Sequence, residues 1–545
     1  MDSVRSLLSR TWTTAALLSA GVGAALAHPA APPAPPDLGP NVFVFDPSMP
    51  LSEIKAKVDA VASQQMANEF GPQRYALLFK PGTYGSAEAP LNFQVGYYTA
   101  VAGLGQSPTD VVIKGSINVY NRCRNGTCFA LDNFWRSMSN LTIQVTDPVG
   151  AGCYAGNFWA VSQASPMRRV NVTGGNLTLM DYCTGPSFAS GGFIADSQAG
   201  TVINGSQQQW LVRDSSVGNW TNGVWNQVFS GVVGAPAPCF PAQASCGGPY
   251  TTLPTSPVTR EAPYLYLDGG RYKVFVPAVR RNSSGTTWAA GQTPGRSIPI
   301  EDFHVAQPGD DAKKIDQALA RGKHLIFTPG IYAVDRTIRI KRAGTVVLGL
   351  GLPSLVPQKG VVPMTVADVP NVAIAGVVFD AGTVNSPLLL QVGTRHGHKD
   401  RNDDRTALHD GSDRKGRRHE PTTLSDVFFR IGGPAAGKAT VSMEINSDDV
   451  ILDNIWAWRA DHGNGVGWTI NTGDTGVIVN GDDVTAYGLF VEHYQKYNAI
   501  WNGERGQVVV FQNELPYDPP SQAAWMSGPG VYGWAALKIS DQVRQ

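Results

Sequence analysis

The sequence lacks two features that would tie the protein to a membrane or to a polyanion. Beyond the first 30 residues, no segment approaches the roughly 18 to 20 uninterrupted apolar residues that a membrane helix needs. Lysine plus arginine and aspartate plus glutamate both number 43, so the formal net charge is zero. This balance gives no reason to expect the basic surface that nucleic-acid binding requires. We therefore expect a soluble protein with neither a membrane nor a nucleic acid as partner.

Cysteine is absent from the second half of the chain. The cysteines form no CxxC pairs and have no histidine partner, which argues against a zinc site. In a chain that enters an oxidising compartment, an even number of cysteines favours disulfides instead. Connectivity cannot be read from spacing, although a local pair such as Cys123 with Cys128 is a candidate. We predict no metal and no cofactor. The six cysteines are Cys123, Cys128, Cys153, Cys183, Cys239 and Cys246.

The N-terminus carries the pattern of a cleavable secretory signal. Arg5 and Arg10 precede an apolar run that ends at the small-residue site Ala25-Leu26-Ala27. We assign residues 1–27 to a signal peptide and the proline-rich run 28–40 to an extended linker, and we expect a secreted, extracellular product. Glycosylation acceptor sites cluster in the first half, which favours a glycosylated first domain in a secreted eukaryotic protein. Their asparagines are Asn125, Asn140, Asn171, Asn176, Asn204, Asn219 and Asn282.

Two segments about 250 residues apart resemble each other. The first runs from Leu51 to Gly105 and contains LSEIKAKVDAVASQQ, then YALLFKPGTY, then GLG. The second runs from Asp311 to Gly351 and contains DAKKIDQALARGK, then HLIFTPGIY, then GLG. Each has an amphipathic helix pattern, an apolar strand and a Pro-Gly-x-Tyr turn in the same order. The pattern predicts a duplication in which each copy opens a domain.

Short apolar strands follow each copy at intervals of roughly 20 residues, separated by Asn, Asp and Gly turns without intervening helices. This pattern predicts an all-β fold of two tandem parallel β-helices, each opened by a capping helix that covers the strand edges. A pair of antiparallel sandwiches is the alternative, although hairpin signals are scarce. We place the domains at 41–296 and 297–545. The charged, histidine-rich segment 395–420 is predicted to be a disordered insertion in the second domain.

Two glutamates stand at equivalent points of neighbouring coils. Glu492 and Glu514 are 22 residues apart, close to one coil, so they can share a ledge on the solenoid surface. Two like charges so placed raise the pKa of one member, which leaves an acid that can donate a proton and a partner that can orient water. Glycoside hydrolases use a pair of carboxyl groups in these two roles. Taken alone, Glu492 could also be a solvated residue at a strand end.

Aromatic residues are dense around this pair. Sugar rings stack on flat aromatic faces while carboxylates and amides bind their hydroxyl groups, so the concentration fits a carbohydrate groove, although some of these rings must be core. The aromatic residues are Trp456, Trp458, Trp468, Tyr487, Tyr494, Tyr497, Trp501 and Tyr517.

The run VEHYQKYNAIWNGERGQVVVFQNELPYDPP resembles the signature of glycoside hydrolase family 55, secreted β-1,3-glucanases built from two tandem right-handed β-helices. The resemblance implies that Glu514 is the general acid and that Glu492 belongs to the network around the nucleophilic water. Two weaker matches, NFWAVSQASPMRRVNV and ASGGFIAD, imply that Gln163 and Ser190 hold this water. In the alternative interpretation, Gln163 is only a residue of a side-chain ladder and Ser190 only a turn residue.

The same resemblance implies an exo-acting, inverting and monomeric enzyme whose partner is β-glucan or a related polysaccharide. The implied substrate-binding residues are Tyr494, Tyr497, Trp501, Gln512 and Tyr517. Adjacent coils suggest a carboxylate spacing of about 5 Å, nearer to that of retaining enzymes, so the expectation of inversion follows the resemblance. Members of the family continue well beyond the acid glutamate, so part of the second solenoid is expected to be missing here.

Other functions fit parts of the sequence. A pectinase-like hydrolase would use NTGD, NGDD, DHG and RIK, but these elements occur here in a different order from that family. They would supply Asp474, Asp482, Asp483, His462 and Arg339. A polysaccharide lyase would need calcium carboxylates and a basic catalyst, for which the neutral charge offers little support. A non-catalytic glycan-binding or cell-surface solenoid is the alternative from a different class.

Overall fold

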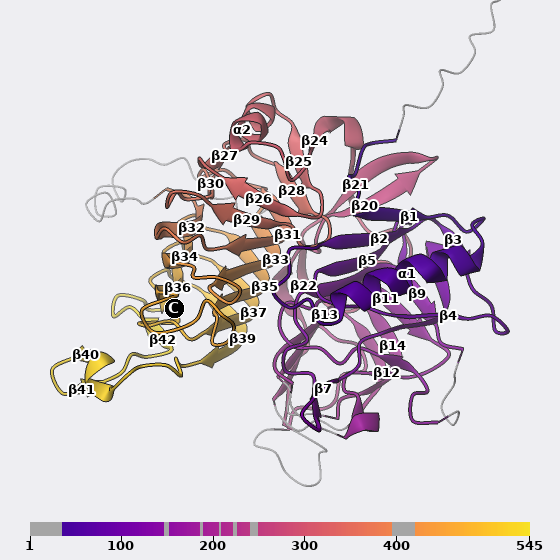
Figure 1. Ribbon diagram of the computed structural model, residues 1–545, viewed down its shortest axis with the longest axis horizontal. Helices are drawn as coiled ribbons and strands as arrows, with labels where there is room; N and C mark the ends of the chain where they lie inside the picture. The colour runs from indigo at the N-terminus through magenta and orange to yellow at the C-terminus, as the bar shows by residue number, and fades with distance from the viewer. Residues whose placement is uncertain are drawn as a thin grey trace, which may run out of the picture. The chain divides into compact units, whose positions relative to one another are not determined.

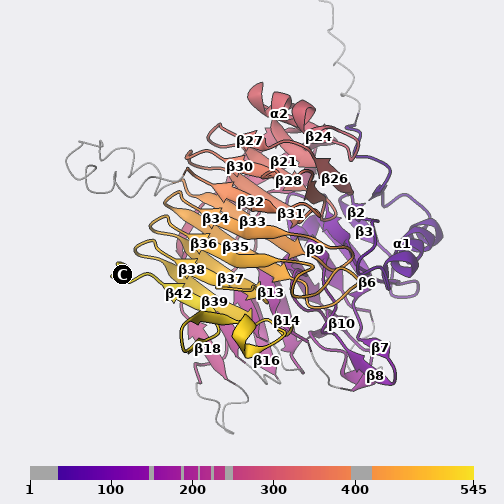
Figure 2. The same ribbon diagram turned by 60° about the vertical axis from the view of Figure 1, so that its left-hand side comes forward.

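The chain winds into two stacks of parallel strands that pack side by side (Figures 1 and 2). The computed structural model describes residues 35–146, 152–185, 189–205, 209–221, 226–239, 249–394 and 420–545. Within it, Pro35–Gln545 forms one compact unit. The predicted signal peptide 1–27, the first part of the linker 28–40 and nearly all of the insertion 395–420 lie outside the described residues.

The first stack contains two runs of parallel strands. One run faces the second stack and has the order β1-β2-β5-β9-β11-β13-β15-β17-β18. Its bounds are β1 (Val42–Phe45), β2 (Tyr75–Phe79), β5 (Thr99–Gly103), β9 (Arg136–Gln144), β11 (Met167–Thr173), β13 (Gly192–Ala195), β15 (Trp210–Arg213), β17 (Gln227–Ser230) and β18 (Tyr250–Leu253). The outer strands are β3 (Gly82–Tyr84), β4 (Leu91–Gln94), β6 (Val111–Asn118), β10 (Asn157–Phe158), β12 (Leu177–Thr178), β14 (Gln198–Ile203) and β16 (Ser216–Thr221), and a small hairpin joins β7 (Arg122–Arg124) to β8 (Thr127–Phe129).

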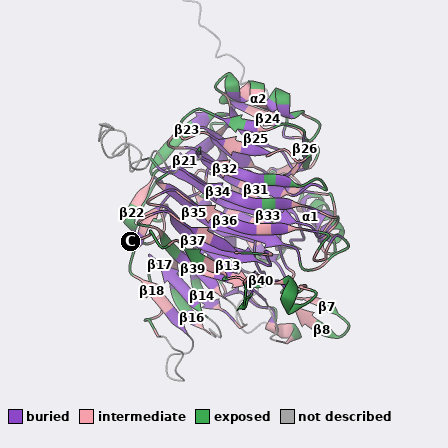
Figure 3. Ribbon diagram, turned by 90° about the vertical axis from the view of Figure 1, so that its left-hand side faces the viewer, coloured by how far each residue is buried: buried purple, intermediate pink, exposed green. Residues whose placement is uncertain are grey.

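The second stack is built in the same way. Its first sheet contains β24 (Phe303–Ala306), β25 (His324–Phe327), β28 (Val346–Gly349), β31 (Ala373–Asp380), β33 (Thr422–Ile431), β35 (Val450–Arg459), β37 (Thr485–Glu492) and β39 (Gln507–Glu514), flanked by β26 (Ile331–Val334) and β29 (Ser354–Pro357). Its second sheet contains β27 (Ile338–Ile340), β30 (Met364–Val366), β32 (Ser386–Val392), β34 (Ala439–Ile445), β36 (Gly473–Val479), β38 (Ala499–Trp501) and β42 (Leu537–Ile539). A short hairpin joins β40 (Met526–Gly528) and β41 (Val531–Tyr532). Figure 3 shows that most residues of strands β31 to β37 are buried.

The all-β parallel β-helix fold is confirmed, because strands one coil apart pair in parallel throughout both stacks. The antiparallel sandwich alternative is wrong for the same reason. Antiparallel strands do occur between the stacks, in a region without a clear hairpin pattern in the sequence. There β19 (Ser256–Thr259) pairs with β22 (Arg280–Ser283), and β21 (Arg271–Pro277) pairs with β20 (Tyr264–Asp268) and β23 (Gly295–Pro299). The domain boundaries at 41–296 and 297–545 remain a prediction.

The predicted duplication has a structural counterpart in each stack. Helix α1 (Leu51–Gln65) packs apolar residues into the first core, and helix α2 (Ala312–Ala320) does so in the second. After each helix, the tyrosine of the Pro-Gly-x-Tyr turn binds equivalent backbone oxygens. The Tyr84 hydroxyl lies 2.9 Å from the carbonyl oxygens of Phe45 and Lys80, and Tyr332 lies 2.8 and 2.9 Å from those of Ala306 and Thr328. These tyrosines tie each turn to the preceding strand.

Each long strand of the second stack bends at a residue with positive φ. Gly376, Asp426, Asn454 and Gly488 occupy this position in β31, β33, β35 and β37, with φ of 70°, 52°, 66° and 65°. Glycine and short polar residues reach this conformation most readily, which explains their recurrence. The β-branched Val510 in β39 continues the column at φ 69°. Because the bend recurs at one level, the strand ends beyond it stay in register.

A buried charge cluster joins the two stacks. Arg168 in β11 contacts Glu261, Asp426 and Asp453 at 2.9, 2.7 and 2.8 Å. Arg213 in β15 contacts Glu261 and Asp453, each at 2.8 Å. Burial alone would raise the pKa of Glu261, but the two guanidinium groups hold it at about 2. These five residues, called here the interface charge cluster, fix the relative position of β11 and β33.

The disulfide prediction is confirmed for two pairs, Cys123–Cys128 and Cys153–Cys183. Cys239 is disulfide-bonded as well, whereas Cys246 lies outside the described residues.

Two of the predicted glycosylation sites are blocked by packing. Asn140 and Asn204 are buried, and their amide groups donate hydrogen bonds within the protein. Glycosylation at the other sites stays a prediction.

In the described parts of the chain, no helix combines the length and apolarity that a membrane crossing needs.

Candidate active site

Glu492 and Glu514 end two neighbouring strands of the second stack and are paired in register. Strands β37 and β39 are parallel, and Glu492 lies opposite Glu514 in the ladder. The expectation that a 22-residue separation corresponds to one coil is therefore confirmed. Paired strands lie about 4.8 Å apart, so the two backbones start close together. Their side chains then contact different neighbours.

The Glu492 carboxylate is buried and held by donors from both stacks. Its side chain is 3% exposed. The indole Nε1–H of Trp456 donates to Oε2 at 2.8 Å, and the Gln163 amide donates to Oε1 at 2.7 Å. The same Gln163 amide nitrogen donates to Ser190 Oγ at 2.9 Å. The structure therefore brings together Gln163 and Ser190 with Glu492, although they belong to opposite stacks.

The Glu514 side chain lies at the mouth of the site. It is 31% exposed, and the hydroxyl of Tyr517 donates to its Oε2. His493 Nε2 lies 3.6 Å from the same oxygen, and Gln512 Nε2 lies 3.4 Å from Oε1. The Tyr517 ring is 69% exposed and packs against His493 with ring centroids 4.6 Å apart. Glu514 can therefore reach a bound molecule, whereas Glu492 cannot do so without moving.

The electrostatics of the pair follow from burial and like charge. Burial, together with the charge of Glu514, raises the pKa of Glu492 to about 8, although hydrogen bonds from Trp456 and Gln512 favour its charged form. Two coupled carboxylates of this kind titrate as a pair. The pair therefore holds one proton near neutral pH.

The predicted substrate-binding residues divide into two groups. Gln512 and Tyr517 lie beside Glu514. Tyr494 is fully buried in the core of the second stack, where its hydroxyl lies 2.6 Å from Ser442 Oγ, and Trp501 is 5% exposed in the same core. The prediction that these two rings contact substrate is wrong, because their side chains point into the solenoid.

Tyr497 shows a different packing. Its ring meets Trp534 edge-on at 4.9 Å and lies 5.3 Å from Lys538 Nζ, and no described contact joins it to either glutamate. A substrate role for Tyr497 stays a prediction.

Two residues that contact the glutamates were not assigned a catalytic role from the sequence, although Trp456 was among the aromatic residues expected around the pair. Trp456 donates to Glu492, and its ring stacks on Trp458 at 4.9 Å, within a cluster that Trp135 completes from the first stack. His493 follows Glu492 directly and has a positive φ of 66°, which turns its ring towards Glu514. In the sequence, the position of His493 directly after Glu492 was the one feature that could have indicated its place at the site.

The residues of the pectinase-like alternative do not gather into one site. His462 lies between two carboxylates, 2.6 Å from Glu69 Oε1 and 2.8 Å from Asp461 Oδ1. Burial disfavours its charged form, but these two contacts raise the pKa of His462 to about 10. The others pair separately: Asp474 with Lys496, Asp482 and Asp483 with Arg505, and Arg339 with Asp316. Among the described residues, no group of His, Cys, Asp or Glu is arranged to hold a metal ion.

Comparisons with known proteins point the same way. Residues 303–514 match the family model of the LAM55 pectate lyase-like domain. An exo-beta-1,3-glucanase from Streptomyces sp. (strain SirexAA-E / ActE) is 50% identical over 509 residues, which cover 93% of this chain and 77% of that relative.

Among solved structures, sacteLam55A from Streptomyces sp. SirexAA-E matches with a TM-score of 0.83 at 48% identity, over 94% of this chain and 86% of the other. A variant of sacteLam55A with a glutamate replaced by alanine, in complex with glucose, matches with a TM-score of 0.82 at 47% identity, over the same shares of the two chains.

A parallel β-helix that carries two neighbouring glutamates, one buried and one accessible, has the pair of carboxyl groups that glycoside hydrolases use. The similarity to the Streptomyces enzyme extends over 93% of the chain and identifies the group to which it belongs. The chain is a member of glycoside hydrolase family 55.

Proposed function

We propose that the protein is a secreted hydrolase that removes glucose from the end of β-1,3-glucan chains with inversion at the anomeric carbon. The observation that carries the proposal is the in-register pair of Glu492 and Glu514, held against Gln163 of the first stack. The exo-beta-1,3-glucanase activity named for the Streptomyces relative supports the substrate and the exo action. The N-terminal pattern and the disulfides support secretion. Because all these contacts come from one chain, we propose that it acts as a monomer.

Glu514 is the proton donor in this proposal. Its carboxyl is accessible, whereas that of Glu492 is buried. The raised pKa of Glu492 keeps the proton of the free pair on Glu492, so in this proposal the proton moves to Glu514 before the glycosidic bond breaks, because only Glu514 can reach the glycosidic oxygen. The proton then passes to the glycosidic oxygen as the bond from that oxygen to the anomeric carbon breaks.

Glu492 receives the proton of the attacking water in this proposal. The Gln163 amide nitrogen is already bonded to Ser190 and Glu492, so its Oε1 is left to accept from a water molecule. As the water oxygen attacks the anomeric carbon, Gln163 Oε1 takes a water proton and Nε2 passes one to Glu492. The two carboxyl groups turn towards different neighbours, and inversion requires that the space between them admit a water molecule.

The proposed stereochemistry and chain-end action can be tested on laminarin, a soluble β-1,3-glucan. We expect glucose as the first product, with the α-anomer appearing before mutarotation in proton NMR. Initial release of β-glucose would contradict inversion, and a mixture of longer oligosaccharides would contradict exo action. Polygalacturonate is the matched negative substrate, and its cleavage in place of laminarin would overturn the proposed substrate.

The raised pKa of Glu492 predicts an alkaline limit to activity. An acid with a raised pKa keeps its proton to higher pH, so the pair loses its one proton as the pH rises through about 8. Without that proton Glu514 has nothing to donate, and we expect kcat to fall about tenfold per pH unit above this point. Measurement of kcat on laminarin from about pH 5 to 10 tests this, with circular dichroism as the folding control. A flat profile to about pH 10 would rule out a shared proton.

A further inference from the structure

A polar groove lies between helix α1 and the outer strands of the first stack. It has a volume of about 450 Å³ and is lined by Lys55, Asp59, Asn92, Gln94, Asn118 and Tyr120, among others. Lys55 Nζ bonds Asp59 at 2.7 Å and the Asn92 carbonyl at 3.2 Å, so this wall is neutral and ordered. The Gln94 side chain is exposed and makes no hydrogen bond among the described residues. The groove therefore offers the exposed amide of Gln94 and carries no net charge, whereas the Asn118 amide is buried and already bonded to Ser116 and Phe158.

Aromatic rings stand at one end of this groove. Tyr120 packs edge-on against Tyr154 at 5.1 Å, and both pack on the buried ring of Phe158 at 5.4 and 5.6 Å. The Tyr182 ring also lies near Phe158, with ring centroids 6.2 Å apart. Tyr154 is 48% exposed and Tyr120 is partly exposed, so these two rings present surface to solvent. We call Tyr120 and Tyr154 the tyrosine pair.

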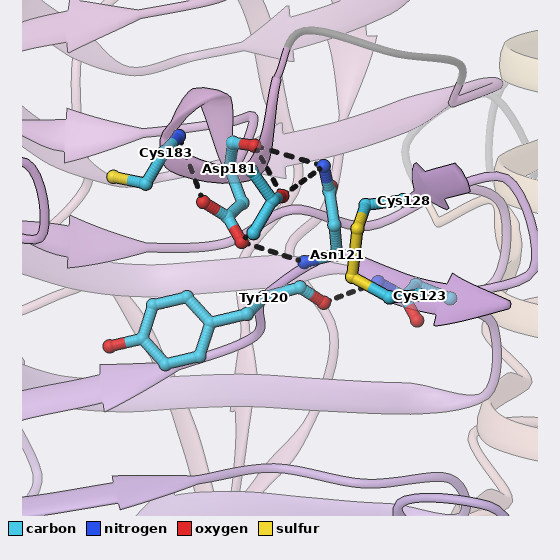
Figure 4. The surroundings of a disulfide bond; sticks show 8 residues. Tyr120, Asn121, Cys123, Cys128, Asp181 and Cys183 are labelled. Carbon is cyan, nitrogen blue, oxygen red and sulfur yellow. Dashed lines mark hydrogen bonds between the residues drawn. A yellow bond between two sulfur atoms is a disulfide. The ribbon is translucent and has the colours of Figure 1, made fainter. Parts of the chain in front are cut away.

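A disulfide and hydrogen bonds tie down the backbone around the tyrosine pair. The Cys153–Cys183 disulfide lies next to Tyr154 and also next to Tyr182. Asn121, which follows Tyr120, donates its side-chain amide to the Asp181 carbonyl at 2.9 Å. Figure 4 shows the hydrogen bonds between Asn121 and Asp181 beside the Cys123–Cys128 disulfide, with the Tyr120 ring extending away from them. Rings held this way lose little conformational freedom when a ligand binds.

We propose that this groove and the tyrosine pair form a second carbohydrate site, which holds a segment of β-1,3-glucan away from the catalytic glutamates. Neutral sugars are recognised by aromatic faces together with amide groups that bind hydroxyls, and the groove supplies both without net charge. In both Figure 1 and Figure 2, most of α1 lies apart from β37 and β39, whose ends carry the glutamates, although the segment after α1 reaches the second stack, where Glu69 contacts His462. The ligand class rests on the proposed function.

A second site on the same molecule has a specific use. It raises the local concentration of chain ends near the catalytic site without taking part in the reaction, so long or insoluble glucan should depend on it and short oligosaccharides should not. This difference separates the second site from an extension of the catalytic cleft.

The test combines Tyr120→Ala with Tyr154→Ala in one variant. In a Glu514→Gln background, which protects the matrix from cleavage, we expect its dissociation constant for insoluble β-1,3-glucan to rise about five- to tenfold. With Glu514 intact, kcat/KM on a β-1,3-linked trisaccharide should not change. Tyr532→Ala is the matched control, because Tyr532 is 76% exposed on β41 and lies outside the groove.

Further variants guard against a folding defect. Tyr120→Phe with Tyr154→Phe keeps the rings and should retain binding, while Gln94→Ala removes only an exposed amide and should weaken it. Unchanged retention in the double alanine variant, with an unchanged melting temperature, would overturn the second site while leaving the proposed function intact. An equal loss of kcat/KM on the trisaccharide would instead assign the rings to the catalytic cleft. A wild-type protein that neither cleaves nor binds β-1,3-glucan would overturn both proposals.

Discussion

Replacing Glu514 with glutamine is expected to lower kcat on laminarin by about 10²- to 10⁴-fold, the range typical of losing a general acid. Glutamine keeps the size of the side chain and can still accept from the Tyr517 hydroxyl, so the local packing should persist. It has no proton to give to the glycosidic oxygen. The loss should therefore fall on kcat, with KM changed much less.

Glu504→Gln is the matched control for this substitution. Glu504 lies on the turn before β39 and accepts only from backbone N–H groups of Arg544 and Gln545, so it should leave kcat within about twofold of wild type. Circular dichroism should show the same spectrum for both variants. Retention of most activity in Glu514→Gln would remove Glu514 from the role of acid and direct attention to Glu492.

Replacing Arg168 with methionine is expected to lower the free energy of unfolding by about 3 to 5 kcal/mol. Arg168 is buried and contacts three carboxylates of the interface charge cluster. Methionine fills part of the volume but leaves these carboxylates short of a positive charge in a buried site. The penalty arises from the stranded charges more than from lost attraction. Guanidinium denaturation followed by tryptophan fluorescence measures the change.

Lys496→Met provides the comparison for the interface variant. Lys496 contacts Asp474 at 2.6 Å, but the two side chains are 46% and 40% exposed. Exposed pairs contribute about 0 to 1 kcal/mol, so this variant should be nearly as stable as wild type. Equal stability of Arg168→Met and Lys496→Met would mean that the interface charge cluster contributes nothing beyond a surface pair.

Local patterns were sufficient to predict the repeating elements. The two helices and the Pro-Gly-x-Tyr turns are encoded within short segments, where apolar spacing and turn residues act directly on the backbone. The pairing of Glu492 with Glu514 was also predictable, because the coil length of a solenoid converts a sequence interval into a stacking distance.

The direction of individual side chains was not predictable in the same way. Tyr494 and Trp501 lie between the two glutamates in sequence, yet both face the core. Tyr494 lies in the connection after β37, and Trp501 lies on β38, which belongs to the other sheet of the stack, so neither follows the alternation of the strands that carry the glutamates. A sequence window shows aromatic density but not the face on which each ring lies.

Contacts between the stacks were beyond reach of sequence patterns, apart from the resemblance that implied Gln163 and Ser190. Arg168 and Asp426 are 258 residues apart, and nothing in the local sequence of either marks the other as its partner. The antiparallel strands β20, β21 and β23 were missed as well. The hairpin between β20 and β21 has its turn at Asp268 and the two glycines that follow. This turn is a short signal within a region whose sequence otherwise resembles a loop.

The bond between Gln163 and Glu492 also bears on how the enzyme acquires activity. It joins residues 329 positions apart, so the catalytic arrangement cannot exist until both solenoids have wound and docked. Contacts of such long sequence separation are costly to close and form late in folding. During refolding from denaturant, β-sheet signal should therefore return first, and hydrolytic activity should return more slowly, at the rate at which the two halves associate.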